Sequence, residues 1–107
     1  MIRNFHAHIY FDPEQAEQAK ALGHAARDKF SVAEGHYHLR PVGPHPRGSC
    51  QLTIGKEQFT DVVSWLVLNR RGLTVFTHAQ TGNALKDHTG HVIWLGPSET
   101  LELSQFR

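Results

Sequence analysis

Residues 5–11 alternate strictly between apolar and polar side chains, and this pattern constrains the fold more than any other. A period of two is that of a β-strand with one side against a core. The apolar side consists of Phe5, Ala7, Ile9 and Phe11. The other side carries His6, His8 and Tyr10. The segment therefore predicts a first strand whose apolar side needs a cover.

A helix is predicted directly after this strand, over about residues 13–29. Asp12 suits the N-cap, Pro13 suits the first helical position, and Gln15 completes the spacing of a capping box. The positions that share one face of the helix are small or apolar, namely Ala16, Ala19, Leu22, Ala26 and Phe30. This face is expected to cover the apolar side of the first strand.

The rest of the chain continues this order of strands and helices. Strands are predicted within residues 31–40 and over 50–54, 73–78 and 91–95, with a second helix over about 59–70. The order predicts an α+β, ferredoxin-like (split βαβ) domain with two helices on one face of an antiparallel sheet. The other face stays open, and a small domain would gain from covering it in a dimer.

The composition fits one small domain, residues 1–107, because 39% of the residues are hydrophobic and 20% are charged. The formal net charge is only +1, so no basic surface favours nucleic acid. No apolar run reaches the length of about 18 residues that predicts a membrane span, and the first residues do not resemble a signal peptide. With Cys50 as the single cysteine, we expect a reducing cytoplasm.

Nine histidines are unusually many for this length, and several of them fall on the predicted open face. Strand parity sends His6, His8 and Tyr10 to that face. The polar positions of the other strands are expected to join them, namely His36, His38, Gln51, Thr53 and His78. A sheet face lined by histidines from three strands predicts either a site or an interface.

Neutral imidazoles bind Fe, Zn, Cu and Ni, so this face predicts a metal site. His6 and His8 project side by side and could share one ion with His38 or His78 from neighbouring strands. Three histidines with water would suit hydrolytic zinc, whereas two histidines with a carboxylate would suit a non-haem Fe(II) oxygenase.

Further candidates lie outside the strand cores. A carboxylate ligand would have to come from Glu34, Asp87 or Glu99, so an all-histidine site also stays open. Three prolines within residues 41–48 stiffen the loop that presents His45, which makes this residue a good candidate for a general acid/base. His88 follows a carboxylate that could orient it or favour its charged form.

Four segments together resemble the DOPA 4,5-dioxygenase family of small ring-opening dioxygenases. They are residues 5–11 (FHAHIYF), 38–46 (HLRPVGPHP), 68–73 (LNRRGL) and 87–89 (DHT) followed by 94–96 (WLG). The resemblance covers roughly residues 5–96, and PVGPHP is its most specific part. It implies a ferredoxin-like domain, often dimeric, that cleaves a catechol such as DOPA extradiol to its hydroxyls with Fe(II) and O2.

The resemblance also implies which histidines form the site. The matching positions are His8, His38, His45, His78 and His88. His8 and His78 are the first choices as ligands of Fe(II), or of zinc or another divalent metal in its place, and His38 is the next. His45 and His88 are the expected catalytic acid/base or positioning groups, with His45 as the acceptor of the second catechol proton.

Arg40 or Arg47 is expected to pair with a substrate carboxylate as a bidentate fork, and His6 and Tyr10 are expected to contact the substrate from the strand. Two other hypotheses use the same histidines. One is a non-catalytic metal-binding or dimerisation module, and the other is a zinc-dependent hydrolase or lyase.

Overall fold

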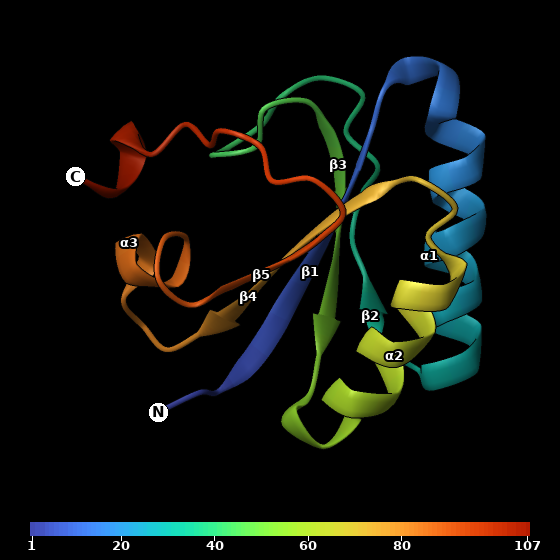
Figure 1. Cartoon of the computed structure of the whole chain (residues 1–107), viewed down its shortest axis with the longest axis horizontal. Helices are drawn as coiled ribbons and strands as arrows, with labels where there is room; N and C mark the ends of the chain where they lie inside the picture. The colour runs from blue at the N-terminus through green and yellow to red at the C-terminus, as the bar shows by residue number, and fades with distance from the viewer.

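Five strands form one antiparallel sheet, and two helices cover one of its faces (Figure 1). The computed structural model describes all 107 residues. The strands are β1 (Asn4–Phe11), β2 (Ala33–Glu34), β3 (Gly48–Ile54), β4 (Thr74–Gln80) and β5 (Val92–Leu95). The helices are α1 (Ala16–Phe30), α2 (Phe59–Asn69) and the short α3 (Ala84–Asp87). The strand order β2-β3-β1-β4-β5 confirms the α+β, ferredoxin-like prediction, with β5 added beside β4.

Both long helices begin in the same way. Asp12 donates its backbone N–H to Gln15 Oε1 at 2.9 Å, and Gly55 donates its backbone N–H to Gln58 Oε1 at 3.0 Å. Each glutamine lies in a 3₁₀ turn, Pro13–Gln15 or Lys56–Gln58, that leads into the α-helix. The predicted helix start is therefore confirmed, although its first turn is 3₁₀.

The core lies between the helices and the apolar side of the sheet. Ala7, Ile9 and Phe11 are fully buried there, as the alternation predicts. Their neighbours across the sheet are Leu52 and Val75. Every one of these side chains is removed from water, which gives the hydrophobic stabilisation of the domain.

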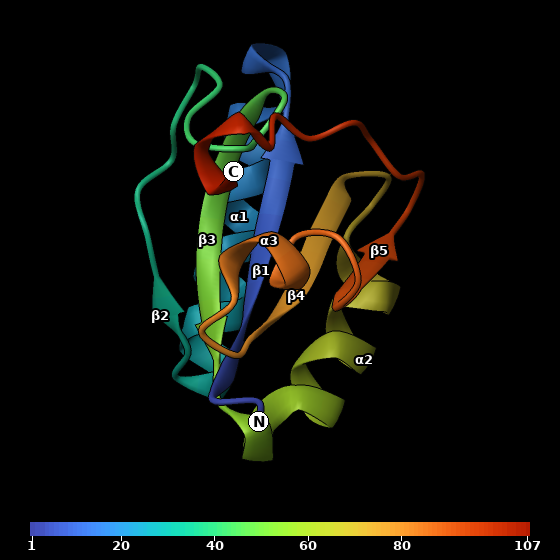
Figure 2. The ribbon, with the colours of Figure 1, turned by 90° about the vertical axis from the view of Figure 1, so that its left-hand side faces the viewer.

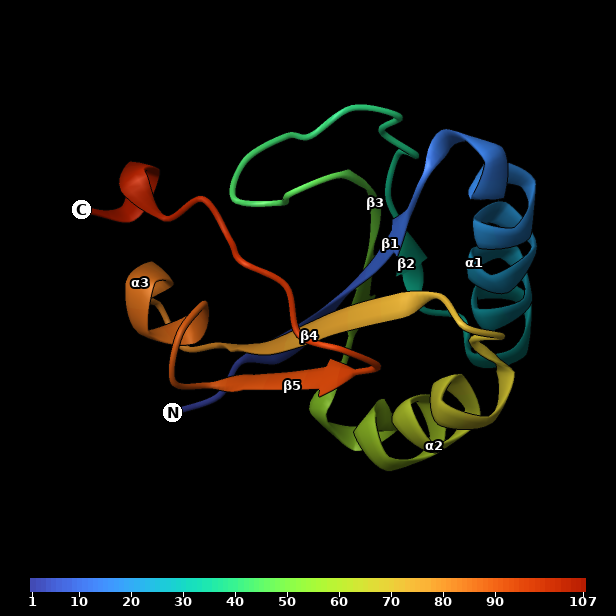
Figure 3. The ribbon, with the colours of Figure 1, turned by 45° about the horizontal axis from the view of Figure 1, so that its top comes forward.

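The polar side of the sheet has no long helix over it, yet it is not bare. The loop before β3, the segment around α3 and the last residues of the chain lie on this side, opposite α1 and α2 (Figures 2 and 3). The last segment ends in a 3₁₀ turn, Ser104–Phe106. The polar side chains beneath, including His8 and His78, are consequently buried.

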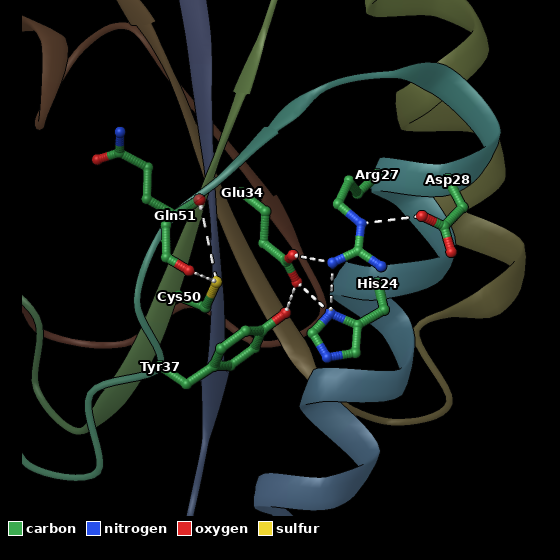
Figure 4. Close-up of polar contacts among 8 residues, drawn as sticks. His24, Arg27, Asp28, Glu34, Tyr37, Cys50 and Gln51 are labelled. Atoms are coloured by element: carbon green, nitrogen blue, oxygen red, sulfur yellow. Dashed lines mark hydrogen bonds and ion pairs between the residues drawn. The ribbon is translucent and has the colours of Figure 1, made fainter.

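The predicted second strand is much shorter than residues 31–40. Only β2 pairs with β3, followed by a single bridge between His38 and Ser49. Glu34 is the last residue of β2, and its side chain turns to α1, where it accepts hydrogen bonds from His24 Nδ1 at 2.7 Å and Arg27 Nη1 at 2.9 Å (Figure 4). The Tyr37 hydroxyl also donates to Glu34.

Gly23 lies inside α1, although a glycine inside a helix costs about 1 kcal/mol relative to alanine. The position of Tyr37 gives the reason. A Cβ at Gly23 would collide with the Tyr37 hydroxyl. The absent side chain lets Tyr37 reach across the helix to Glu34.

No helix of the chain is long and apolar enough to span a bilayer.

Candidate metal centre

His6, His8 and His78 form a cluster on the polar side of the sheet, here called the histidine cluster. One nitrogen from each ring lies within 4.8 Å of the others. The register of β1 and β4 brings them together, because His6 is directly opposite His78 and His8 is two positions further on the same side. The closest pair is His8 Nε2 and His78 Nε2, at 3.0 Å.

The His78 ring is fixed by the backbone. Its Nδ1 donates a hydrogen bond to the Ala79 carbonyl at 3.0 Å, so the proton of the neutral ring is on Nδ1 and the Nε2 lone pair faces His8. A backbone acceptor of this kind commonly orients a metal-ligating histidine. The Gln51 amide lies 3.4 Å from His6 Nε2 and borders the cluster on the β3 side.

The histidine cluster is neutral at physiological pH. Burial, and then the neighbouring imidazoles, lower the pKa of His8 well below its usual 6.5. Burial also lowers the pKa of His78 to about 4, although the bond to the Ala79 carbonyl opposes this shift. Burial is also the main cause that lowers the pKa of His6. Neutral imidazoles have free lone pairs, which is the form that metals bind.

The donors of the histidine cluster are close enough together to be candidate ligands of one divalent ion. The Nε2 atoms of His8 and His78 lie 3.0 Å apart, within hydrogen-bond distance of each other. Three neutral imidazoles are a suitable ligand set for Fe(II) or Zn.

None of the predicted carboxylates joins the histidine cluster. Asp87 is buried at the end of α3, where it accepts hydrogen bonds from the Thr81 N–H at 2.7 Å and hydroxyl at 2.6 Å. His91 donates to it at 2.8 Å. Burial alone would raise the pKa of Asp87, but these hydrogen bonds lower it to about 2. Glu34 faces α1 and Glu99 pairs with Arg47, which leaves an all-histidine cluster.

His45 lies against the histidine cluster, with its ring centre 4.2 Å from that of His8. The backbone of the proline-rich loop holds it, because the His45 N–H donates to the Val42 carbonyl at 3.1 Å. Its Nδ1 shares a hydrogen bond of 2.7 Å with the buried Tyr10 hydroxyl, which leaves Nε2 without a protein partner. Burial lowers the pKa of His45 to about 4 and raises that of Tyr10.

A cleft of about 290 Å³ opens beside His8 and His45. Its wall carries polar side chains and two glycines but no Asp, Glu, Lys or Arg. The lining residues other than these two histidines are Gly35, His36, His38, Val42, Gly43, Ser49 and Gln51. His38 is thus exposed on the cleft wall rather than in the histidine cluster, and His6 occupies the place at the cluster that His38 was expected to share.

His88 flanks the other side of the histidine cluster. Its ring centre lies 4.2 Å from that of His78 and 4.4 Å from that of Phe106, and its Nδ1 donates to the Ala84 carbonyl at 2.7 Å. Phe106 was not predicted, because the last residues show no periodic pattern. Phe76 and Trp94 complete an aromatic border, with ring centres 4.5 Å apart.

The two arginines expected to pair with a substrate carboxylate, Arg40 and Arg47, do not line this cleft. Arg40 is exposed and does not line the cleft. Arg47 donates to Glu99 through Nε at 3.1 Å and Nη2 at 2.8 Å, and to Asp12 through Nη1 at 3.2 Å. The Arg47 guanidinium therefore joins the loop before β3 to the last segment of the chain.

Comparisons with known proteins identify the family of this chain. The sequence profile of the Dopa 4,5-dioxygenase family matches residues 5–105. DOPA 4,5-dioxygenase of Amanita muscaria is 34% identical over 96% of this chain, which spans 49% of that protein. An uncharacterised 21.2 kDa protein of Botryotinia fuckeliana is 34% identical over 94% of the chain, which spans 61% of it.

The fold has a solved counterpart as well. The crystal structure of a proposed dioxygenase from Nostoc punctiforme is 38% identical in sequence and superimposes with a TM-score of 0.81. The match covers 94% of this chain and 87% of that one. The chain spans 49% and 61% of the length of these two curated relatives, and the family profile matches nearly the whole chain. Because the family profile matches nearly the whole chain, this chain belongs to the Dopa 4,5-dioxygenase family.

Proposed function

We propose that the chain is an extradiol dioxygenase that opens the ring of a catechol such as DOPA at a non-haem Fe(II) site. The observation that carries this proposal is the histidine cluster, in which three neutral imidazoles converge beside a cleft. His6, His8 and His78 are the proposed ligands. Bound Fe(II) would acidify the catechol hydroxyls and supply the electron transfer needed for reaction with O2.

His45 is the proposed general acid/base. Its Nε2 has no protein partner and would accept the second catechol proton, while Tyr10 holds Nδ1 and thereby the orientation of the ring. The pKa of about 4 is that of the ring without substrate, lowered mainly by burial and then by the neighbouring histidines. An anionic catecholate beside the ring favours the imidazolium, so the pKa rises when substrate binds.

The cleft beside His8 is the proposed place for the substrate. It adjoins both the histidine cluster and His45, and its volume of about 290 Å³ suits a single aromatic ring with a short side chain. Phe106 and His88 close the opposite side of the cluster, where they exclude water from His78.

The direct experiment is to load the protein with Fe(II) without oxygen, add DOPA, and then admit air. Visible absorbance and oxygen uptake are recorded in the same vessel. We expect a yellow semialdehyde to form with one O2 consumed per product. No colour and no uptake with DOPA and simple catechols, despite bound iron, would refute the proposal and favour a hydrolytic or purely binding role.

A matched pair of variants tests the ligand assignment. His78→Ala should lose bound iron and turnover together, because it removes one of the converging nitrogens. Thr77→Val changes the adjacent residue, whose side chain lies on the helix side of β4, and should keep both. Full iron content and turnover in His78→Ala would exclude this residue as a ligand.

A further inference from the structure

His91 and Asp87 form a hydrogen-bonded pair outside the histidine cluster, and the proposed function does not use it. His91 Nδ1 donates to Asp87 Oδ1 at 2.8 Å. The Asp87 side chain is only 2% exposed, and Thr81 donates to it through both its N–H and its hydroxyl. Three hydrogen bonds therefore hold this buried carboxylate against the His91 ring.

The carboxylate fixes which nitrogen of the neutral His91 ring carries the proton. Nδ1 is the donor to Asp87, so Nε2 carries the lone pair. No group of the chain bonds to Nε2, and the His91 side chain is 39% exposed. A carboxylate that holds an imidazole in this way leaves the other nitrogen as a hydrogen-bond or proton acceptor.

The backbone of His91 is held in place as well. Its N–H donates to the Lys86 carbonyl at 3.1 Å, and its carbonyl accepts the Ala79 N–H at 3.0 Å. The position of the Nε2 acceptor is therefore set before any ligand arrives. A preorganised acceptor lowers the entropic cost of binding.

His91 lines a groove of about 490 Å³, where the first residues of the chain lie near the start of β5 (Figures 1 and 3). Most of its wall is apolar and is supplied by Ile2, Phe5, Ala79, Val92 and Ile93. Ile2 is 36% exposed and Ile93 is 41% exposed, so this surface is open to a ligand. No residue of the groove lines the cleft beside His8.

We propose that this groove binds a small phenol, whose hydroxyl donates a hydrogen bond to His91 Nε2 and whose ring lies against the apolar wall. The single acceptor selects a ligand with a proton to donate. A carboxylate or phosphate ligand lacks that proton and would bring a negative charge close to Asp87. An ammonium ligand would lose its hydration against the apolar wall. A neutral aromatic ring with one acidic hydroxyl meets both requirements.

Amide NMR of the isotope-labelled full chain, titrated with 4-ethylphenol, tests where a phenol binds. A pH of about 8 keeps the phenol protonated and lies above the usual titration range of histidine. We expect saturable shifts of the Thr81, Val92 and Ile93 amide signals. A response only at Gly43 and Gln51, which line the cleft, would overturn the proposal.

A second ligand isolates the hydrogen bond to His91. The isomer 4-methylanisole has the same atoms as 4-ethylphenol but no hydroxyl proton, so it cannot donate to Nε2. It should bind the wild type roughly tenfold more weakly, because one hydrogen bond is lost. In His91→Phe this difference between the two isomers should disappear.

Ile93→Ala is the matched control. It removes apolar wall and leaves the acceptor, so it should weaken the binding of both isomers by a similar factor and keep the preference for the phenol. A purely structural role for the pair of His91 and Asp87 would give the wild type no such preference. Equal Kd values of the two isomers for the wild type would therefore overturn the proposal, whether or not His91→Phe folds.

Discussion

The two sides of the sheet are both buried, but different parts of the chain bury them. The side facing α1 and α2 is filled by apolar side chains such as Ile9 and Leu52, which need only close packing. On the other side, His8, His78 and Tyr10 are buried by loops and the last segment, and they bond to one another or to nearby groups. The apolar side therefore supplies the stability of the fold. The polar side supplies neutral imidazoles, which can bind a metal, beside a cleft.

The largest expected effect of a single change on the histidine side is on turnover. His45→Asn should lower kcat by roughly 10² to 10⁴-fold, because it removes the proposed proton acceptor. Iron content and the urea unfolding midpoint should stay near those of the wild type, since His45 is not part of the histidine cluster. Steady-state oxygen uptake measures the loss, and a kcat within tenfold of the wild type would exclude this role.

A change on the helix side should have the opposite signature. Leu52→Ala should cost about 2–5 kcal/mol of the free energy of unfolding, because it leaves a cavity at a fully buried position. Below its unfolding transition the variant should still bind iron in the same ratio. Urea denaturation monitored by tryptophan fluorescence gives the value, and a cost under about 1 kcal/mol would contradict the packing described here.

Acid should weaken the metal-free protein as its buried histidines take up protons. The pKa values of His45 and His78 are about 4 in the folded protein against 6.5 in the unfolded chain. Between these pH values the unfolded state binds more protons, so stability falls as pH falls. Each proton of difference gives a slope of about 1.4 kcal/mol per pH unit. The free energy of unfolding, measured by urea denaturation from pH 7 to 4, should fall with this slope in the wild type and in Leu52→Ala alike. A free energy of unfolding that does not change with pH would contradict the prediction.

A smaller gain is expected from Thr77, whose side chain lies on the helix side. Its Oγ1 is buried without a hydrogen-bond partner, so the hydroxyl is desolvated with nothing in return. Thr77→Val keeps the shape and should raise the free energy of unfolding by about 1 kcal/mol. Thermal unfolding measures the change, and Thr77→Ser, which retains the hydroxyl and loses a methyl group, should be destabilised instead.

The smallest effect should come from the ion pair that holds the last part of the chain, residues 97–107, over the polar side of the sheet. These residues are called the covering segment below. Arg47 and Glu99 are both about a quarter exposed, so a double-mutant cycle with Arg47→Met and Glu99→Gln should give a coupling of about 0.2–1 kcal/mol. Amide exchange in residues 97–107 should quicken in either variant while that of β1 stays unchanged. A uniform increase across the sheet would show that the pair supports the whole fold.

Strand and helix positions followed closely from the sequence because their periodicity is local. The alternation in residues 5–11 placed His8 on the side opposite Ile9, and the same parity placed His78 beside it. The predicted partner His38 could not be distinguished from His6 in this way. Which histidine meets His78 depends on the register of β1 against β4, and register is set by packing between distant segments.

Other parts of the site lacked any local signal. The Asn83 side chain starts α3 by accepting the Lys86 N–H at 3.1 Å, and no helix was predicted between the strands over 73–78 and 91–95. The covering segment has neither alternation nor a helical stripe, so the contacts of Glu99 and Phe106 could not be foreseen. These residues act through contacts with partners more than 15 positions away in the chain.

Glu34 links the outer surface of α1 to the wall of the proposed substrate cleft. It is anchored by His24 and Arg27, and the residues that follow it, Gly35 and His36, line the cleft. A substitution on the exposed face of α1 can therefore shift the backbone of that wall without altering any residue in it. Variants selected for a different catechol should accumulate changes at His24 and Arg27 as well as in the cleft, so distance from the histidines is a poor guide to which positions control substrate preference.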